Sequence, residues 1–229
     1  MSHMLKIKLL LIVLLGFAAI SFAAGGGKIV AADPTKHFDP KGKMPSEFTI
    51  ELQNGLRKSL PFEDKRDFEE AKKGFIAAPE YKQIMAEAGH VAWDMGSYEF
   101  LLTDKEYDTI HPSLQRQAVL NMAYGLYEVM PDKIYQIRGY DLANITFIKG
   151  EKGWIIFDPL TAKETAAAAL KFINEQLGER PVTAVVYSHS HADHFGGVRG
   201  VVEEADVRSG KVPVIAPIGF MDHSVSENV

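Results

Sequence analysis

The sequence contains no cysteine. Disulfide bonds, thiolate-bound zinc and cysteine nucleophiles are therefore excluded, and any transition metal must be bound by His, Asp or Glu. The sequence also lacks a long run of Lys or Arg, and its formal net charge is −5 at pH 7. Because a phosphate backbone attracts a clearly basic surface, we expect no nucleic-acid partner.

The N-terminus carries a targeting pattern. Lys6 and Lys8 precede an apolar run over residues 9–20, and small residues follow at Ser21, Ala23 and Ala24. This order is typical of a secretory signal peptide over residues 1–23, with cleavage before Ala24. The alternative is an uncleaved anchor, but the apolar run is shorter than the about 20 residues that span a bilayer. We therefore expect a secreted or periplasmic protein with no stable membrane anchor.

Residues 24–125 are expected to form an N-terminal arm with helices. Residues 25–43, rich in Gly, Pro, Lys and Asp, predict an extended arm. Helices are predicted over 64–75 and, opened by Pro112, over 112–124. Between them, short irregular strands and turns are predicted over 81–103. Trp93, Tyr98 and Phe100 are expected to anchor this segment against a larger body.

Residues 126–229 show the pattern of a layered α/β domain. An alanine-rich helix is predicted over 163–177, with an apolar stripe of Leu170, Ile173 and Leu177 and a stop at Gly178. The strand 182–187 is apolar at nearly every position, which predicts burial on both faces. The other predicted strands span residues 126–129, 133–138, 144–149 and 153–157. Together, 46% apolar residues in a chain of 229 are enough for a substantial core.

A cluster of possible metal ligands follows the last strand, at His189, His191, Asp193 and His194. In an extended loop, residues two apart point the same way, so His189 and His191 can bind one ion. Asp193 and His194 can then face a second ion, about 3.5–4 Å from the first. Imidazole and carboxylate donors suit zinc, with manganese or iron as alternatives. Asp193 is also the candidate catalytic residue.

Exposed histidines of a polar loop are the simpler interpretation of this cluster. The buried strand that precedes the loop favours a metal site instead, as do Gly196 and Gly197 after it. These glycines let the backbone turn tightly beneath the metals, where a side chain would collide.

His189-Ser190-His191-Ala192-Asp193-His194 resembles the His-x-His-x-Asp-His signature of the metallo-β-lactamase superfamily. The resemblance implies an αββα fold, of which residues 126–229 would be the first half only. Asp158 is similar to the superfamily's acidic residue that lies behind the metals and supports the histidine loop. The alternative role for Asp158 is a cap on the helix that begins at Lys163.

A narrower resemblance runs from about Asp64 to the last residue. The stretches that carry it are 74–79, 125–129, 134–139, 144–148 and 225–229, and they are similar to zinc-dependent alkyl sulfatases. This resemblance implies two zinc ions, hydrolysis of long-chain esters such as dodecyl sulfate to alcohol and inorganic sulfate, and a homodimer joined through N-terminal segments. Ile218 departs from the pattern, since an acidic residue is expected there.

Few further ligands are expected in this sequence. His223 is interpreted as an exposed helical position, and the remaining acidic candidates as solvated residues. Those candidates are Glu203, Glu204, Asp206 and Glu227. We therefore interpret the sequence as a fragment whose other ligands lie beyond Val229, and expect it to be poorly soluble and inactive alone.

Two alternatives to an alkyl sulfatase remain. One is another hydrolase that shares the histidine motif, such as a lactamase, lactonase or thioesterase. The other is a non-catalytic metal-binding or dimerisation module.

Overall fold

The computed structural model describes residues 44–103 and 105–228. The chain divides into two units, Met1–Met44 and Pro45–Val229. The second unit holds the elements described below. The predicted signal peptide, its cleavage before Ala24 and the extended arm over 25–43 lie outside the described residues.

The second unit opens with the helix α2 (Glu47–Ser59), which the sequence analysis did not anticipate. Ser46 caps it by accepting a hydrogen bond from the Thr49 amide, and Arg57 and Lys58 stabilise the negative end of its dipole. The buried Gln53 donates to the Asp108 carbonyl at 3.0 Å. α2 is thereby tied to the loop that leads into α4 (Pro112–Asn121), which has proline at its start as predicted.

The helix predicted over 64–75 is much shorter in the structure. It is reduced to α3 (Arg66–Glu70), and the residues that follow form the first strand, β1 (Phe75–Ala77). Gly74 explains the difference, because it adopts φ +72° and a Cβ there would lie 2.0 Å from the Glu128 carbonyl oxygen. Only glycine fits this turn, and the residues after it pair with a neighbouring strand.

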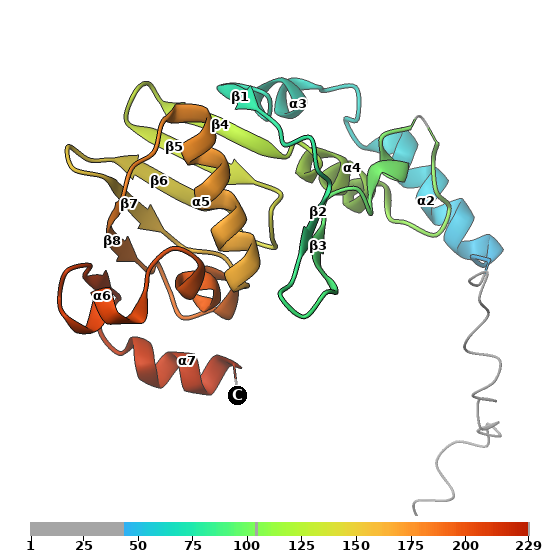
Figure 1. The fold of residues 1–229 in the computed structure, drawn as a ribbon. Coiled ribbons are helices and arrows are strands. Elements are labelled where there is room, and N and C mark those ends of the chain that lie inside the picture. The colour runs from blue at the N-terminus through green and yellow to red at the C-terminus, as the bar shows by residue number, and fades with distance from the viewer. Residues whose placement is uncertain (1–43, 104, 229) are drawn as a thin grey trace, which may run out of the picture. The chain divides into compact units, whose positions relative to one another are not determined.

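Seven strands form one sheet in the order β1-β4-β5-β6-β7-β8-β9 (Figure 1). Pairing is antiparallel from β1 to β7, whereas β7, β8 and β9 are parallel. The strands predicted from alternation are confirmed, with ends shifted by one residue at most. They are β4 (Gly125–Met130), β5 (Ile134–Arg138), β6 (Ile145–Lys149), β7 (Trp154–Phe157) and β8 (Val182–Val186). The two outer strands, β1 and β9 (Val214–Ile215), were not predicted.

The crossover between β7 and β8 is α5 (Lys163–Leu177), confirmed at both predicted ends. Gly178 stops it at φ +93°. The predicted apolar stripe is partly wrong, because Leu177 is 36% exposed and Leu170 is only half-buried. The face that meets the sheet is made of Ala166, Ala169, Phe172 and Ile173. The small Ala166 side chain lets the helix approach Gly197 and Gly200 closely, because a Cβ at either glycine would lie 3.0 Å from the Ala166 Cβ.

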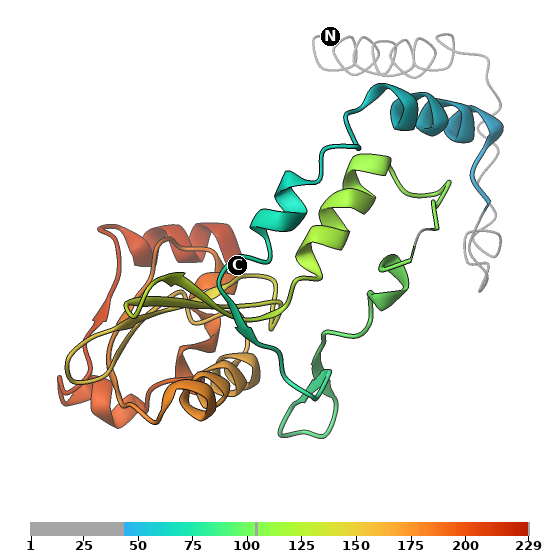
Figure 2. The ribbon, with the colours of Figure 1, turned by 90° about the horizontal axis from the view of Figure 1, so that it is seen from above.

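The two faces of the sheet differ in burial. The face covered by α5 (Figures 1 and 2) is fully buried and holds Tyr135, Ile137, Ile145, Phe147, Trp154, Ile156 and Val185. The opposite face is only half-buried, at Gln136, Thr146, Ile148, Ile155, Phe157, Ala184 and Val186. The prediction that residues 182–187 are covered on both faces is therefore wrong for the described chain.

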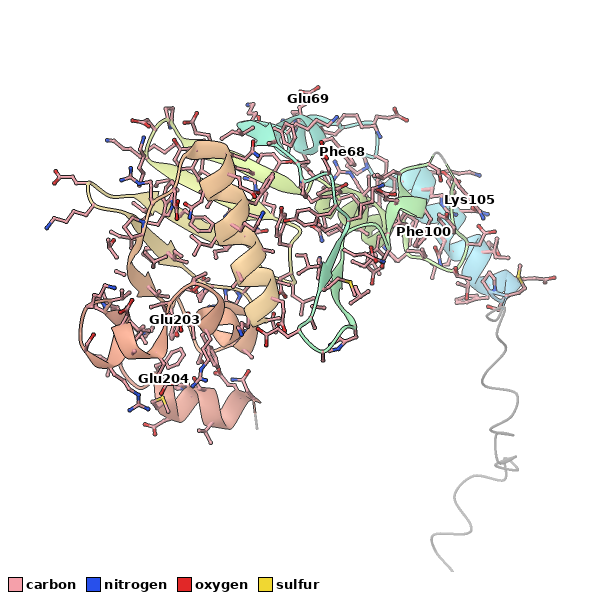
Figure 3. All side chains as sticks on the ribbon, viewed as in Figure 1. Phe68, Glu69, Phe100, Lys105, Glu203 and Glu204 are labelled. Carbon is pink, nitrogen blue, oxygen red and sulfur yellow. The ribbon has the colours of Figure 1, made fainter. Side chains whose placement is uncertain are left out.

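The segment before α4 contains the hairpin β2 (Gln83–Met85) and β3 (Val91–Asp94), followed by η2 (Glu99–Leu101). Trp93 anchors it as predicted, packing on the core and donating to the Gly139 carbonyl at 2.8 Å. Tyr98 and Phe100 are wrong as anchors, being 58% and 48% exposed. Figure 3 labels Phe100. Within the described part of the chain, no helix has the length and apolar character needed to cross a bilayer.

Candidate metal centre

The candidate site lies where β7 and β8 end. These strands are parallel and Phe157 pairs with Val186, so the residues that follow them leave the sheet at the same edge. Side chains in the loops after parallel strands converge at this edge. Asp158 follows β7 and the loop from Ser188 to His194 follows β8, which brings a carboxylate to the histidines from 30 residues away.

Asp158 is bonded to the histidine loop. It accepts hydrogen bonds from the Ser188 amide at 2.8 Å and the Ser188 hydroxyl at 2.6 Å, and lies 3.0 Å from Nδ1 of His194. It does not cap α5, so that alternative is wrong. With Nδ1 of His194 protonated toward Asp158, the Nε2 lone pair is left free for a metal, as in carboxylate–histidine–metal arrangements.

The four predicted ligands lie on this loop, and two of them, His189 and His194, form a group with Asp158 that could hold a metal ion, whereas His191 and Asp193 are not part of that group. The ring of His189 lies 4.1 Å from that of His194 and 4.7 Å from that of His191, measured between centroids. Nε2 of His194 is 3.4 Å from a carboxylate oxygen of Asp193. Asp158, His189 and His194 each offer a ligand atom, and these atoms lie within 4.8 Å of one another. The donors are imidazole nitrogens and carboxylate oxygens, which fit a divalent transition metal.

Within this group, Asp158 differs from the others in how its oxygens are used. One oxygen accepts a hydrogen bond from the Ser188 amide. The other accepts from the Ser188 hydroxyl and faces Nδ1 of His194. Nδ1 of His189, in turn, lies 2.8 Å from the Ser188 hydroxyl. Asp158 therefore fits the role of orienting His194 and the loop better than that of a direct ligand.

The short helices η3 (Ala192–His194) and η4 (Gly196–Gly200) follow the loop. A Cβ at Gly196 would lie 2.4 Å from the Thr161 carbonyl oxygen, and one at Gly197 would lie 2.2 Å from that of Pro159. Glycine is thus needed, as predicted, although the close neighbour is the backbone of residues 159–162. This contact seats the end of the histidine loop on the segment that begins at Asp158.

Asp141 is a supporting residue that the sequence analysis missed. It is 7% exposed, and its carboxylate accepts hydrogen bonds from the Thr161 amide, the Ala162 amide and the Thr165 hydroxyl. It therefore holds the two residues before α5 and bonds to Thr165 in the first turn of that helix, which fixes the segment beneath Gly196 and Gly197. Its partners lie 20 to 24 residues away, so no local pattern marks it.

The helix α7 (Phe220–Asn228) lies against the histidine loop. His223 on it is exposed, as predicted. Glu227 is also exposed, but its carboxylate accepts a hydrogen bond from the Ser190 hydroxyl, a contact that was not predicted. The side chain of Ile218 is fully exposed and lies in the turn before α7.

The other acidic candidates form surface ion pairs around α6 (Glu204–Arg208). Glu204 pairs with Arg199 and Arg208, and Asp206 pairs with Lys211. Figure 3 labels Glu203 and Glu204 at the start of this helix. These residues are solvated, as predicted, and contribute no ligand to the cluster at Asp158, His189 and His194.

Tyr187 precedes the loop, and burial raises the pKa of its phenol to about 12. Its hydroxyl is therefore neutral at physiological pH, and it contributes no negative charge to the site. Its ring packs instead on Phe195 at the other end of the loop, with centroids 5.8 Å apart.

Replacing Asp158 with alanine is expected to weaken metal binding by about 10- to 100-fold, because His194 and the Ser188 amide lose the group that orients them. Competition with a chromophoric chelator measures this affinity. Asp206→Ala is the matched control, since it removes an acidic group that pairs with Lys211 on the surface. Equal affinities in the two variants would contradict the role given to Asp158.

Known proteins resemble the chain in both sequence and fold. The family model of the metallo-beta-lactamase superfamily matches residues 138–229 of the chain. An (R)-specific secondary-alkylsulfatase from Pseudomonas sp. is 52% identical over 82% of this chain and 28% of its own length. An alkyl/aryl-sulfatase from Saccharomyces cerevisiae is 46% identical over 81% of this chain and 28% of its own length.

Among solved structures, a stereoselective inverting sec-alkylsulfatase from Pseudomonas sp. superposes with a TM-score of 0.77 and 52% identity. The match covers 82% of this chain and 29% of that protein. The chain thus spans somewhat more than a quarter of the length of the relatives that it matches.

Proposed function

We propose, from the premise that the chain belongs to the alkylsulfatase family of the metallo-β-lactamase superfamily, that the whole protein hydrolyses alkyl sulfate esters to an alcohol and inorganic sulfate. One observation carries this proposal. In a chain 52% identical to a secondary alkylsulfatase, Asp158 supports the histidine loop and lies beside two of the predicted ligands, His189 and His194. Because the chain spans 28% of that relative, the activity is proposed for the whole protein.

We propose further that the site takes two zinc ions. His189 and His191 would hold one ion, and Asp193 and His194 would face the other. When bound, such ions lower the pKa of a coordinated water to about 7 and stabilise developing negative charge. The described residues do the positioning. Asp158 fixes the orientation of His194, and the glycine contacts with the Thr161 and Pro159 carbonyls fix the path of the loop.

The bond that is cleaved is proposed from one relative. The solved sec-alkylsulfatase is described as inverting. Inversion at the carbon that bears the sulfate requires that the oxygen of water attack this carbon from the side opposite the sulfate. The C–O bond then breaks, sulfate leaves with the bonding electrons, and the oxygen of water becomes the alcohol oxygen. At 52% identity, we expect the same outcome for this protein.

The experiment is hydrolysis of a chiral secondary alkyl sulfate by the purified, zinc-loaded whole protein in ¹⁸O-labelled water. We expect release of inorganic sulfate, ¹⁸O in the alcohol and inverted configuration, with about two zinc ions per chain. Label in the sulfate would contradict C–O cleavage. The absence of sulfate release, with turnover of a lactam, lactone or thioester, would favour another hydrolase of the superfamily. Bound metal without any turnover would favour a non-catalytic module.

We also propose that the protein forms a homodimer through its N-terminal segments. The helix α2 supports this, because Phe48 and Leu52, one turn apart, are 75% and 53% exposed. Apolar side chains of this size at neighbouring positions favour burial against a partner. Light scattering tests the proposal: the wild type should have twice the mass of its chain, and Phe48→Asp with Leu52→Asp should be monomeric. A monomeric wild type would refute it.

Export is proposed from the N-terminal targeting pattern alone. Mature protein that begins at Ala24 in the periplasm or medium would support this proposal. Full-length protein retained in the cytoplasm would contradict it.

A further inference from the structure

The helix α7 contacts the histidine loop at both of its own ends. At the first end, the Phe220 ring lies 5.3 Å from that of Tyr187 and 5.2 Å from that of Phe195, between centroids. Tyr187 and Phe195 are the residues just before and just after the loop that begins at Ser188 and ends at His194. Phe220 therefore joins the two bases of this loop in one aromatic cluster.

At the other end of α7, the Asn228 side chain binds the middle of the loop. Its amide nitrogen donates to the Ser190 carbonyl at 2.8 Å, and its amide oxygen accepts from the Ala192 N–H at 3.0 Å. These two backbone groups flank His191. A primary amide that engages a carbonyl and an N–H in this way takes the place of a neighbouring strand's peptide and holds the backbone extended. His191 accordingly has φ −73° and ψ 138°.

Glu227 adds a side-chain contact beside this pair. The Ser190 hydroxyl donates to its carboxylate, and Ser190 is only 9% exposed. A hydrogen bond to a charged acceptor is stronger than a neutral one and prefers a narrow geometry. Ser190 lies between His189 and His191, so this bond restrains the residue that joins two predicted ligands.

We propose that Asn228 and Glu227 are positioning residues of the metal site, which hold the His191 backbone so that its imidazole faces that of His189. This inference rests on the proposed metal-binding function. The energetic reason is preorganisation: an ion that meets a loop already in its bound conformation does not have to order it. Asn228 and Glu227 carry out this role from outside the His189–His194 segment.

The test compares Asn228→Ala, Asn228→Asp and Glu227→Gln with Ser226→Ala in the full chain. Ser226 is an exposed neighbour on α7, and its hydroxyl donates within the helix to the His223 carbonyl at 3.1 Å, its one hydrogen bond among the described residues. Three quantities are measured: hydrogen exchange at the Ala192 amide, relaxation of the His191 imidazole in the metal-free chain, and zinc affinity by chelator competition. Circular dichroism shows whether each variant keeps its fold.

We expect Asn228→Ala to weaken zinc binding about tenfold, to speed exchange at Ala192 and to increase the mobility of the His191 ring. Asn228→Asp keeps an acceptor for the Ala192 amide but loses the donor to Ser190, so exchange should stay slow while zinc binding still weakens. Glu227→Gln should weaken zinc binding by a smaller factor, and Ser226→Ala should match the wild type.

Unchanged zinc affinity and ring mobility in a folded Asn228→Ala variant would overturn the inference. If the unsubstituted chain bound no zinc, the proposed metal function would fail. The exchange and ring-relaxation measurements would still decide whether Asn228 positions His191, because both are made without metal.

Discussion

A variant with both His189 and His191 replaced by alanine is expected to bind less than one metal ion per chain and to cleave no sulfate ester in the whole protein. These two rings lie edge to face with their centroids 4.7 Å apart, and together they would supply the donors of one proposed ion. Without them, His194 is the one imidazole of the loop that could still bind this ion. Removal of an outer supporting group lowers activity by up to about 100-fold, and the loss of activity in this variant should be larger.

The control removes two histidines that lie outside the cluster. His90 and His223 are both exposed, and neither side chain takes part in a hydrogen bond among the described residues. The double variant His90→Ala with His223→Ala should therefore keep wild-type metal content and activity. Metal content is measured by atomic emission after gel filtration, and activity as released sulfate. If the His189, His191 variant kept both its metal and its activity, the assignment of the site would be wrong.

The largest effect on folding is expected at Asp141. Alanine there leaves the Thr161 and Ala162 amides without their acceptor. The Thr165 hydroxyl, in a side chain that is 1% exposed, loses one of its two acceptors and keeps the Ala162 carbonyl. A buried donor that loses its partner costs about 1–3 kcal/mol, and water will satisfy some of these groups. We expect the free energy of unfolding to fall by about 3–5 kcal/mol, measured by urea denaturation.

Two further variants separate this effect from a change in net charge. Glu179→Ala removes the same charge from an exposed position and should leave the free energy of unfolding within about 0.5 kcal/mol of wild type. Asp141→Asn keeps the size of the side chain but replaces one acceptor oxygen with a donor. Because that donor would face other donors, Asp141→Asn should still be clearly destabilised. A wild-type midpoint for Asp141→Ala would refute this account.

The sequence predicts the central part of this fold well because its signals are local there. Alternation between Leu126 and Phe157 marks the strands, and the alanine-rich run ending at Gly178 marks the helix between β7 and β8. The histidine loop follows from residue types at fixed spacing, which need no knowledge of the rest of the chain. The structure then brings Asp158 to this loop, as one of its two predicted roles required.

What the sequence does not reveal depends on distant partners. The conformation of Gly74 is imposed by contact with Glu128, so the helical pattern over 64–75 could not show where the helix ends. Asp141 and Asn228 resemble ordinary loop and helix residues until the fold places their partners beside them. α2 differs from these residues, because its cap at Ser46 and its basic last turn are local signals that lie in the sequence itself.

The position of Asn228 in the chain has a consequence during synthesis. Asp158 leaves the ribosome before the histidine loop, but Asn228 follows His194 by 34 residues (228 − 194). At about 5–20 residues per second, that interval is about 2–7 s. During it, the nascent loop has its acidic support but not the amide that holds the peptide groups beside His191. An ion captured in that interval would meet a looser set of donors, so metal selection should sharpen only once the last turn of α7 has emerged.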